Sequence, residues 1–170
     1  MGVNKIIYII MTGINDLCNL KYTGATPNKS HILISCSIFK LKDMYRNFHV
    51  YINGLCSLIE YISTAEDKTL IRIYFDLSIK NDKLFIDLYN NNVVKSYVQF
   101  CEYKCPSFIL DNYHRGTFGT FVRFLPMFDS TLDVRLIYIS DIDYVTREKI
   151  FYIKYVIRKF IKSDYDVLCI

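Results

Sequence analysis

The chain has 170 residues, of which 52% are hydrophobic, 16% aromatic and 22% charged, and its formal net charge is +4. This composition excludes an intrinsically disordered chain, and the length indicates one globular domain with a sizeable core. The small positive charge suits an anionic ligand such as a nucleotide, but it does not indicate a nucleic-acid-binding protein.

The apolar N-terminal run and the cysteine spacing bear on the compartment of the chain and on metal binding. Residues 6–11 are apolar, but this run is too short for a membrane span or a secretory signal. We therefore expect a cytoplasmic chain with reduced thiols and no membrane span. Cys101 and Cys105 stand four positions apart, and no second pair with histidine follows at zinc spacing, so a zinc site is not expected.

The first half of the chain predicts strands and helices in alternation. We expect a short strand over residues 5–11, a loop over 12–29, a strand over 31–39, an amphipathic helix over 44–62 and a strand over 70–76. The order strand, helix, strand is a βαβ unit. The strands over 31–39 and 70–76 should therefore be parallel, with a right-handed crossover.

The second half continues the alternation. We expect a short helix over residues 81–89, a strand over 93–103 that could form a sheet edge, and a helix that starts near residue 117 and is kinked or ended by Pro126. A turn over 129–133, a buried strand over 134–139, a helix over 146–162 and a strand over 167–170 follow. The predicted fold is α/β, a mostly parallel open sheet with helices on both faces. Residues 1–30 form an N-terminal strand and loop segment, and residues 31–170 form the main domain.

Two carboxylates follow the apolar strand over residues 134–139. Asp141 and Asp143 leave the strand at its carboxyl end, which is the edge where open α/β sheets bind ligands. Two acids one residue apart repel each other, so a cation or an array of donors is needed between them. A solvated surface loop is the alternative interpretation for such a D-x-D pattern.

A glycine-rich stretch over residues 114–126 is the second informative segment. Gly116 and Gly119 allow a backbone to approach a ligand closely, and a helix beginning near Thr117 would direct N–H groups at an anion. Arg123 would then lie about two turns into the helix, where its guanidinium could reach a phosphate. Close helix packing, with Arg123 at the surface, is the alternative.

Two further polar positions end the predicted parallel strands. Ser35 belongs to a run of small residues that leaves room for a flat ligand ring, although such residues equally suit helix–sheet packing. Asp76 ends the strand over 70–76 and could contact a ligand or cap the turn that follows it.

The run R-G-T-F-G-T-F-V-R-F-L-P-M-F-D, followed by V-R-L-I-Y-I-S-D-I-D, resembles the donor-binding half of GT-A-fold nucleotide-sugar glycosyltransferases. It is most similar to glycosyltransferases of giant DNA viruses, and the similarity covers about residues 30–170. A viral origin would place the chain in the host cytoplasm. Such enzymes continue well past D-x-D, so the resemblance implies a domain that is incomplete at its C-terminus.

The resemblance implies a nucleoside-diphosphate sugar as donor, an unknown glycan, protein or lipid acceptor, and Mn²⁺ or Mg²⁺ as cofactor. Asp143 would ligate the metal, and Asp141 would assist there or hold the donor ribose. Arg123 would lie near the donor phosphates or pair with the acids, with Asp76 and Ser35 near the nucleoside. No catalytic base can be assigned, so a non-catalytic interaction or structural protein on a reduced α/β domain is the alternative function.

Overall fold

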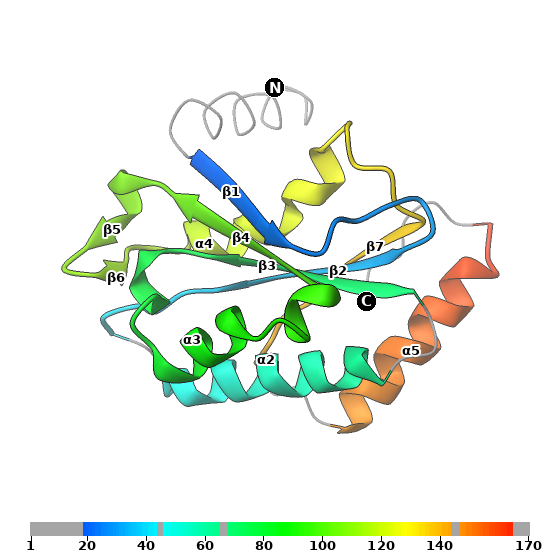
Figure 1. Cartoon of the computed structure of the whole chain (residues 1–170), viewed down its shortest axis with the longest axis horizontal. Coiled ribbons are helices and arrows are strands. Elements are labelled where there is room, and N and C mark those ends of the chain that lie inside the picture. The colour runs from blue at the N-terminus through cyan, green and yellow to red at the C-terminus, as the bar shows by residue number, and fades with distance from the viewer. Residues whose placement is uncertain (1–18, 44–45, 65–67, 144–146, 165–170) are drawn as a thin grey trace.

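The computed structural model of this chain describes residues 19–43, 46–64, 68–143 and 147–164. The strands predicted over 5–11 and 167–170 lie outside these residues. The described elements form a five-stranded sheet of order β1-β4-β3-β2-β7, with helices on both of its faces, and a small two-stranded hairpin (Figure 1). The chain is thus an α/β protein with a mostly parallel sheet.

The central parallel strands were predicted closely. β2 (Ile32–Ile38) is buried along its whole length and pairs in parallel with β3 (Thr69–Phe75). Between them runs α2 (Phe48–Ser63), which begins where the side chain of Asn47 accepts a hydrogen bond from the His49 backbone N–H. The predicted βαβ unit is therefore confirmed. Its helix packs on the sheet through residues at helical spacing, among them Ile52, Leu55 and Leu58.

The prediction of a loop over residues 12–29 is wrong for residues 19–24 and is confirmed for residues 25–29. β1 (Asn19–Gly24) pairs antiparallel with β4 (Val98–Lys104), which in turn lies parallel to β3. β4 is consequently an inner strand and not an edge. The burial of β1 is low and irregular, so its strand character comes from backbone hydrogen bonds to β4, which an apolar period cannot reveal.

The strand that carries the D-x-D pattern also departs from the prediction. β7 (Leu136–Ile139) is half-buried along its length and pairs with β2 alone, so it forms the edge of the described part of the sheet. The apolar run of residues 134–139 predicts a buried strand. An edge strand that is covered on both faces also requires apolar residues, so this pattern does not distinguish it from an inner strand.

The helices lie on the two faces of the sheet as Figure 1 shows. α2, α3 (Lys83–Asn90) and α5 (Arg147–Ile161) cover one face, where Ile32, Ile153 and Ile157 form a core cluster at the β7 end. α4 (Phe118–Phe121) and the 3-10 segment η4 (Val122–Phe128) cover the other face. The helix predicted near residue 117 therefore has only one α-helical turn before it tightens to 3-10 geometry around Pro126.

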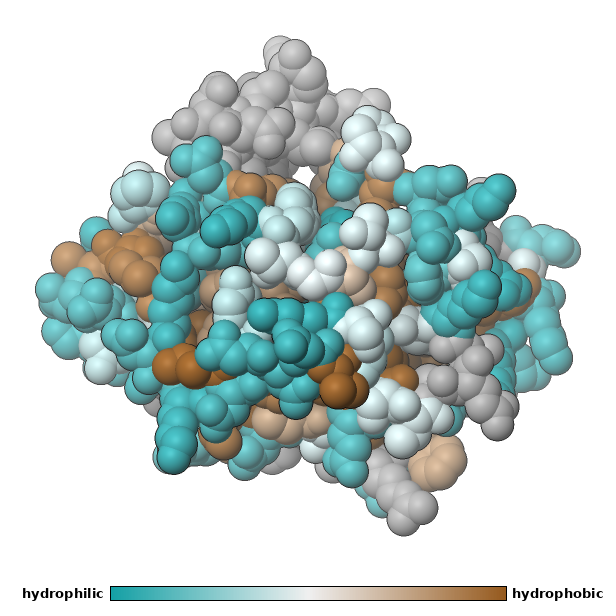
Figure 2. Space-filling view, viewed as in Figure 1, coloured by the Kyte–Doolittle hydropathy of each residue, from teal (hydrophilic) through white to brown (hydrophobic). Residues whose placement is uncertain are grey.

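Short elements complete the connections. Three 3-10 turns, η1 (Leu77–Ile79), η2 (Val94–Ser96) and η3 (Pro106–Phe108), flank α3 and β4. β5 (Ile109–Leu110) and β6 (Tyr113–His114) form the hairpin. Figure 2 shows that the face over α3 is mostly hydrophilic and that hydrophobic residues gather at the hairpin end, where Leu110 is exposed.

Candidate functional site

The strand order of the sheet reverses between β2 and β7. From β2 the chain crosses through α2 to β3 on one side, whereas β7 joins β2 on the other side. In open α/β sheets, ligands bind outside the carboxyl ends of the strands at such a point. Ser140 directly follows β7, and its backbone N–H donates to the carbonyl of Ser35 in the middle of β2 at 2.9 Å, so hydrogen bonding between the two strands continues up to the start of the D-x-D segment.

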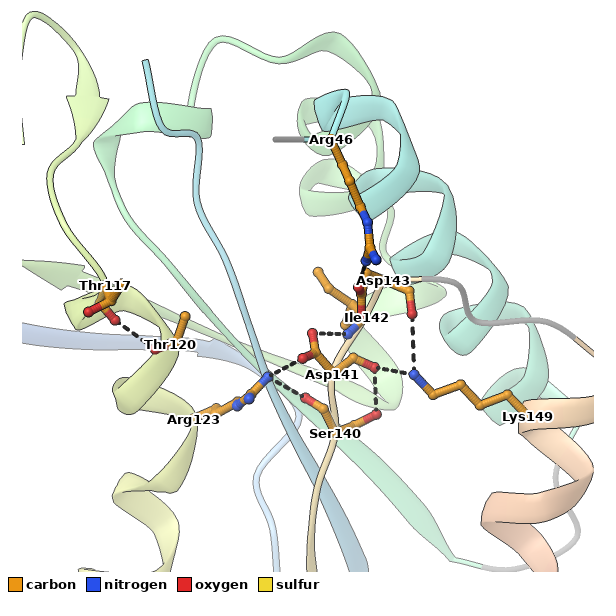
Figure 3. A network of polar contacts seen from close by, with 9 residues as sticks. All are labelled: Arg46, Thr117, Thr120, Arg123, Ser140, Asp141, Ile142, Asp143 and Lys149. Carbon is orange, nitrogen blue, oxygen red and sulfur yellow. Dashed lines mark hydrogen bonds and ion pairs between the residues drawn. The ribbon is translucent and has the colours of Figure 1, made fainter. Parts of the chain in front are cut away.

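Arg123 from η4 and Asp141, which follows β7, form an ion pair at this point (Figure 3). Nη1 of Arg123 lies 3.3 Å from Oδ2 of Asp141 and donates to the Ser140 carbonyl at 3.4 Å. The Asp141 side chain is 56% exposed, whereas that of Arg123 is 20% exposed and its buried Nε has no hydrogen-bond partner. A partly exposed guanidinium therefore lies beside a solvent-accessible carboxylate.

Asp143 is paired with a different arginine. Arg46, just before α2, forms an ion pair with Asp143, and the two side chains are 33% and 23% exposed. Lys149 from α5 donates from Nζ to the backbone carbonyls of Asp141 and Asp143, at 3.3 and 3.2 Å. Figure 3 shows the three basic side chains converging on the D-x-D segment from three elements. The donor array expected between two neighbouring acids is thus provided by the protein itself.

The acids suit a hard cation only if a ligand supplies further oxygen atoms. In the part of the chain that the structure describes, no cluster of three or more His, Cys, Asp or Glu residues could hold a metal ion. Mg²⁺ and Mn²⁺ accept oxygen ligands, and Mg²⁺ is commonly held by one or two carboxylates together with substrate phosphates and water. Asp141 and Asp143 fit that incomplete donor set, provided that each exchanges its basic partner for the cation.

Ser35 is buried and serves packing, whereas Gly116 and Thr117 of the glycine-rich stretch are exposed. The Ser35 hydroxyl is fully buried and donates to the Arg123 carbonyl at 2.6 Å, so it holds the arginine segment on the sheet. Gly116 has a positive φ of 75°, and Thr117 precedes α4, where its carbonyl accepts the Thr120 hydroxyl hydrogen bond at 2.6 Å. For Ser35, the packing alternative left open by the sequence is therefore the one that the structure favours.

Asp76 lies in a buried network and not beside the exposed Asp141 side chain. Oδ2 of Asp76 is 2.6 Å from Nδ1 of His114, and both side chains are at most 1% exposed. The other carboxylate oxygen accepts hydrogen bonds from the backbone N–H and the hydroxyl of Ser78. Through the first of these bonds, Asp76 caps the N-terminus of η1. The capping role that the sequence left open is thus observed, together with a histidine contact that the sequence did not indicate.

The same histidine fixes the start of α4. Nε2 of His114 accepts the Gly119 backbone N–H at 3.0 Å, so Nδ1 carries the ring hydrogen and donates it to Asp76. The Gly119 N–H is therefore already bonded within the protein, and the expectation that it faces an anionic ligand is not met. Because both ring nitrogens are buried and bonded, His114 positions the backbone and does not resemble an exposed catalytic base.

The thiols near the site do not supply a nucleophile. Burial raises the pKa of the Cys36 thiol to about 12, so it stays protonated at neutral pH. Cys36, Cys56 and Cys101 carry free thiols, whereas Cys105 is disulfide-bonded, which corrects the expectation of uniformly reduced cysteines.

Sequence reasoning missed three polar residues that the structure brings to these networks: Arg46, His114 and Lys149. Arg46 and Lys149 lie in or beside amphipathic helices, where a basic side chain normally indicates a solvated face. His114 is the first residue of the glycine-rich stretch, but no spacing rule links it to Asp76, which lies 38 positions earlier.

We expect Gly119→Ala to destabilise the protein by about 1–3 kcal/mol through overpacking. A Cβ at this position would lie 2.4, 2.6 and 2.8 Å from three atoms of the Phe39 ring, which also packs against His114 with ring centroids 4.6 Å apart. Urea unfolding of Gly119→Ala, Phe39→Leu and the double variant would measure the coupling. The double variant should lose less than the sum of the two single losses, and strictly additive losses would contradict this packing account.

Comparison with known proteins gives no family assignment. A scan against protein-family models, a search of curated proteins and a search of solved structures each found no match. Within the described ranges, no helix combines the length and apolar character needed to cross a membrane. The site must therefore be interpreted from its own geometry.

Proposed function

We propose that the chain is a GT-A-like glycosyltransferase or its donor-binding portion, and that it holds a nucleoside-diphosphate sugar at the carboxyl ends of β2 and β7. The observation that supports this most directly is the Arg123–Asp141 ion pair at the point where the strand order reverses. A diphosphate suits a partly exposed guanidinium, because a guanidinium can donate two parallel hydrogen bonds to phosphate oxygen atoms.

In this proposal the chain's own residues bind and orient the donor. Arg123 exchanges part of its contact with Asp141 for a phosphate oxygen, while the Ser35 hydroxyl holds its backbone in place. Asp143 and Asp141 would hold Mn²⁺ or Mg²⁺, which would neutralise the charge that develops on the diphosphate leaving group. Lys149 fixes the D-x-D backbone through both carbonyls, so the acids stay at the end of β7 when their side-chain partners change.

Calorimetric titration with UDP-sugars and GDP-sugars in the presence of Mn²⁺ would test the proposal. We expect one of them to bind, and we expect Arg123→Ala and Asp143→Ala each to weaken that binding about 10- to 100-fold, the range for a lost hydrogen bond to a charged group. Chelation of the metal should weaken binding of the wild-type chain and should add little to the loss in Asp143→Ala.

Matched controls lie in the same segment of the chain. Arg135 and Asp133 are exposed and stand just before β7, so Arg135→Ala and Asp133→Ala remove equal charges near the site. Their affinities should stay within about twofold of the wild type, as for surface charges screened by water. If no nucleotide sugar binds the wild type, or if all four variants bind equally, the transferase proposal fails and the non-catalytic alternative takes its place.

A further inference from the structure

A second polar feature lies on the other side of Arg46 from the D-x-D acids. A cleft of about 300 Å³ opens between the β2–α2 connection, the first turn of α2 and the β6 strand. Lys40, Lys42 and Arg46 line it together with Tyr113, and Asp82 is its one lining carboxylate among the described residues. The first turn of α2 adds no acidic side chain. The lining of this cleft is therefore predominantly cationic.

Lys40 is held within the cleft by aromatic rings. Its Nζ lies 5.5 Å from the centroid of the Phe48 ring and 6.0 Å from that of the Tyr113 ring. The Lys40 backbone N–H donates to the Ser78 hydroxyl at 2.8 Å, which fixes the chain where it leaves β2. No ion pair of Lys40 is seen within the described part of the chain. Ring contacts orient an ammonium group but do not neutralise its charge, so Lys40 can still attract an anion.

The other charges of the cleft leave its positive character largely intact. Lys42 lies 3.7 Å from Asp111, but the two side chains are 67% and 66% exposed, so water screens this pair. Oδ1 of Asp82 accepts the Phe85 backbone N–H at the start of α3, an interaction that anchors this carboxylate to the helix. Arg46 pairs with Asp143 and thereby connects the cleft to the D-x-D segment.

We propose that this cleft binds a phosphate group through Lys40 and Lys42, with Arg46 at the side that faces the D-x-D acids. Ammonium groups bind phosphate as point charges, and an arginine adds a planar pair of donors. The phosphate can come from the nucleotide donor itself or from a phosphorylated acceptor. The inference goes beyond the proposed transferase function, since it requires only an anionic ligand and neither Arg123 nor a metal.

The test uses inorganic pyrophosphate as the probe, titrated calorimetrically into the full chain in the presence of a metal chelator. The variant Lys40→Ala/Lys42→Ala removes the two lysines and leaves Arg46 in place. Its control is Lys21→Ala/Lys29→Ala, because those two lysines are exposed on β1 and in the turn after it and carry the same total charge. We expect the cleft variant to bind at least about tenfold more weakly and the control within about twofold of the wild type.

Three results would overturn the inference: no pyrophosphate binding by the wild type, unchanged binding by the cleft variant, or an equal loss in the lysine control. Circular dichroism of both double variants would establish that a loss of binding is not a loss of folding. Arg123→Ala separates this proposal from the transferase proposal. It should weaken nucleotide-sugar binding and leave pyrophosphate binding in the cleft unchanged, so that either proposal can fail without the other.

Titrations with uridine diphosphate and with a sugar monophosphate would identify the source of the phosphate. If the lysine pair is needed for uridine diphosphate alone, the cleft holds part of the donor. If it is needed for the sugar monophosphate alone, the cleft holds a phosphorylated acceptor. Failure of the cleft variant to weaken either ligand would again contradict the phosphate site.

Discussion

Replacing Asp76 with alanine is expected to lower the free energy of unfolding by about 3–5 kcal/mol, because the carboxylate satisfies several buried donors at once. These donors are Nδ1–H of His114 and the backbone N–H and hydroxyl of Ser78. With both Asp76 and His114 at most 1% exposed, water cannot replace the lost acceptor without opening the structure. Urea denaturation monitored by far-UV circular dichroism would measure the loss.

Two further variants make the result interpretable. Asp87 lies exposed on α3, so Asp87→Ala removes the same side chain at a solvated position and should change stability by less than about 0.5 kcal/mol. Asp76→Asn keeps one acceptor oxygen and should fall between the wild type and Asp76→Ala. A loss below about 1 kcal/mol for Asp76→Ala would show that the Asp76–His114 network does not stabilise the fold in the way the geometry implies.

Phe100→Ala is the second variant for which we expect a large effect, a destabilisation of about 3–5 kcal/mol from a cavity in the core. Phe100 is fully buried on β4, and its ring centroid lies 5.1 Å from that of Tyr89, 6.1 Å from Phe85 and 6.4 Å from Phe75. These contacts fasten α3 to the sheet. The loss should therefore include weaker protection of α3 amides in hydrogen exchange as well as a lower unfolding midpoint.

Phe121→Ala is the matched control for Phe100→Ala. Phe121 is an aromatic residue of the same size that is 60% exposed on α4, so its truncation removes little buried surface and should cost less than about 1 kcal/mol. Similar losses in the two variants would contradict the assignment of β4 as an inner strand, because an outer strand would leave the Phe100 ring accessible to water.

Some of the packing around Asp76 and Phe100 can be inferred from the sequence. The apolar patterns of residues 31–39 and 44–62 predict a buried strand and a helix that covers it, and the βαβ rule then predicts their parallel neighbour. The position of β4 between two strands could not be predicted in this way. It depends on β1, which has no regular apolar period and pairs through its backbone with β4, about 80 positions further along the chain.

In the candidate site, too, one part could be predicted from the sequence and another part required the structure. Hydrophobic patterning followed by two acids predicts that Asp141 and Asp143 stand at the carboxyl end of a strand, and the structure places them there. The resemblance implies that Arg123 lies near the donor phosphates or pairs with the acids, and the structure shows a pair between Arg123 and Asp141. The pairing of Asp143 with Arg46, just before α2, required the fold, since ion pairs between distant segments leave no periodic trace in a sequence.

Local periodicity and chain connectivity predict the α/β class, the parallel βαβ unit and the strand end that carries the acids. Tertiary packing places β7 at the edge of the described sheet, bonds Asp76 to His114 inside the protein, and brings three basic side chains around the D-x-D segment. Such contacts depend on which remote residues the packed elements bring within hydrogen-bonding distance, and local propensities do not contain that information.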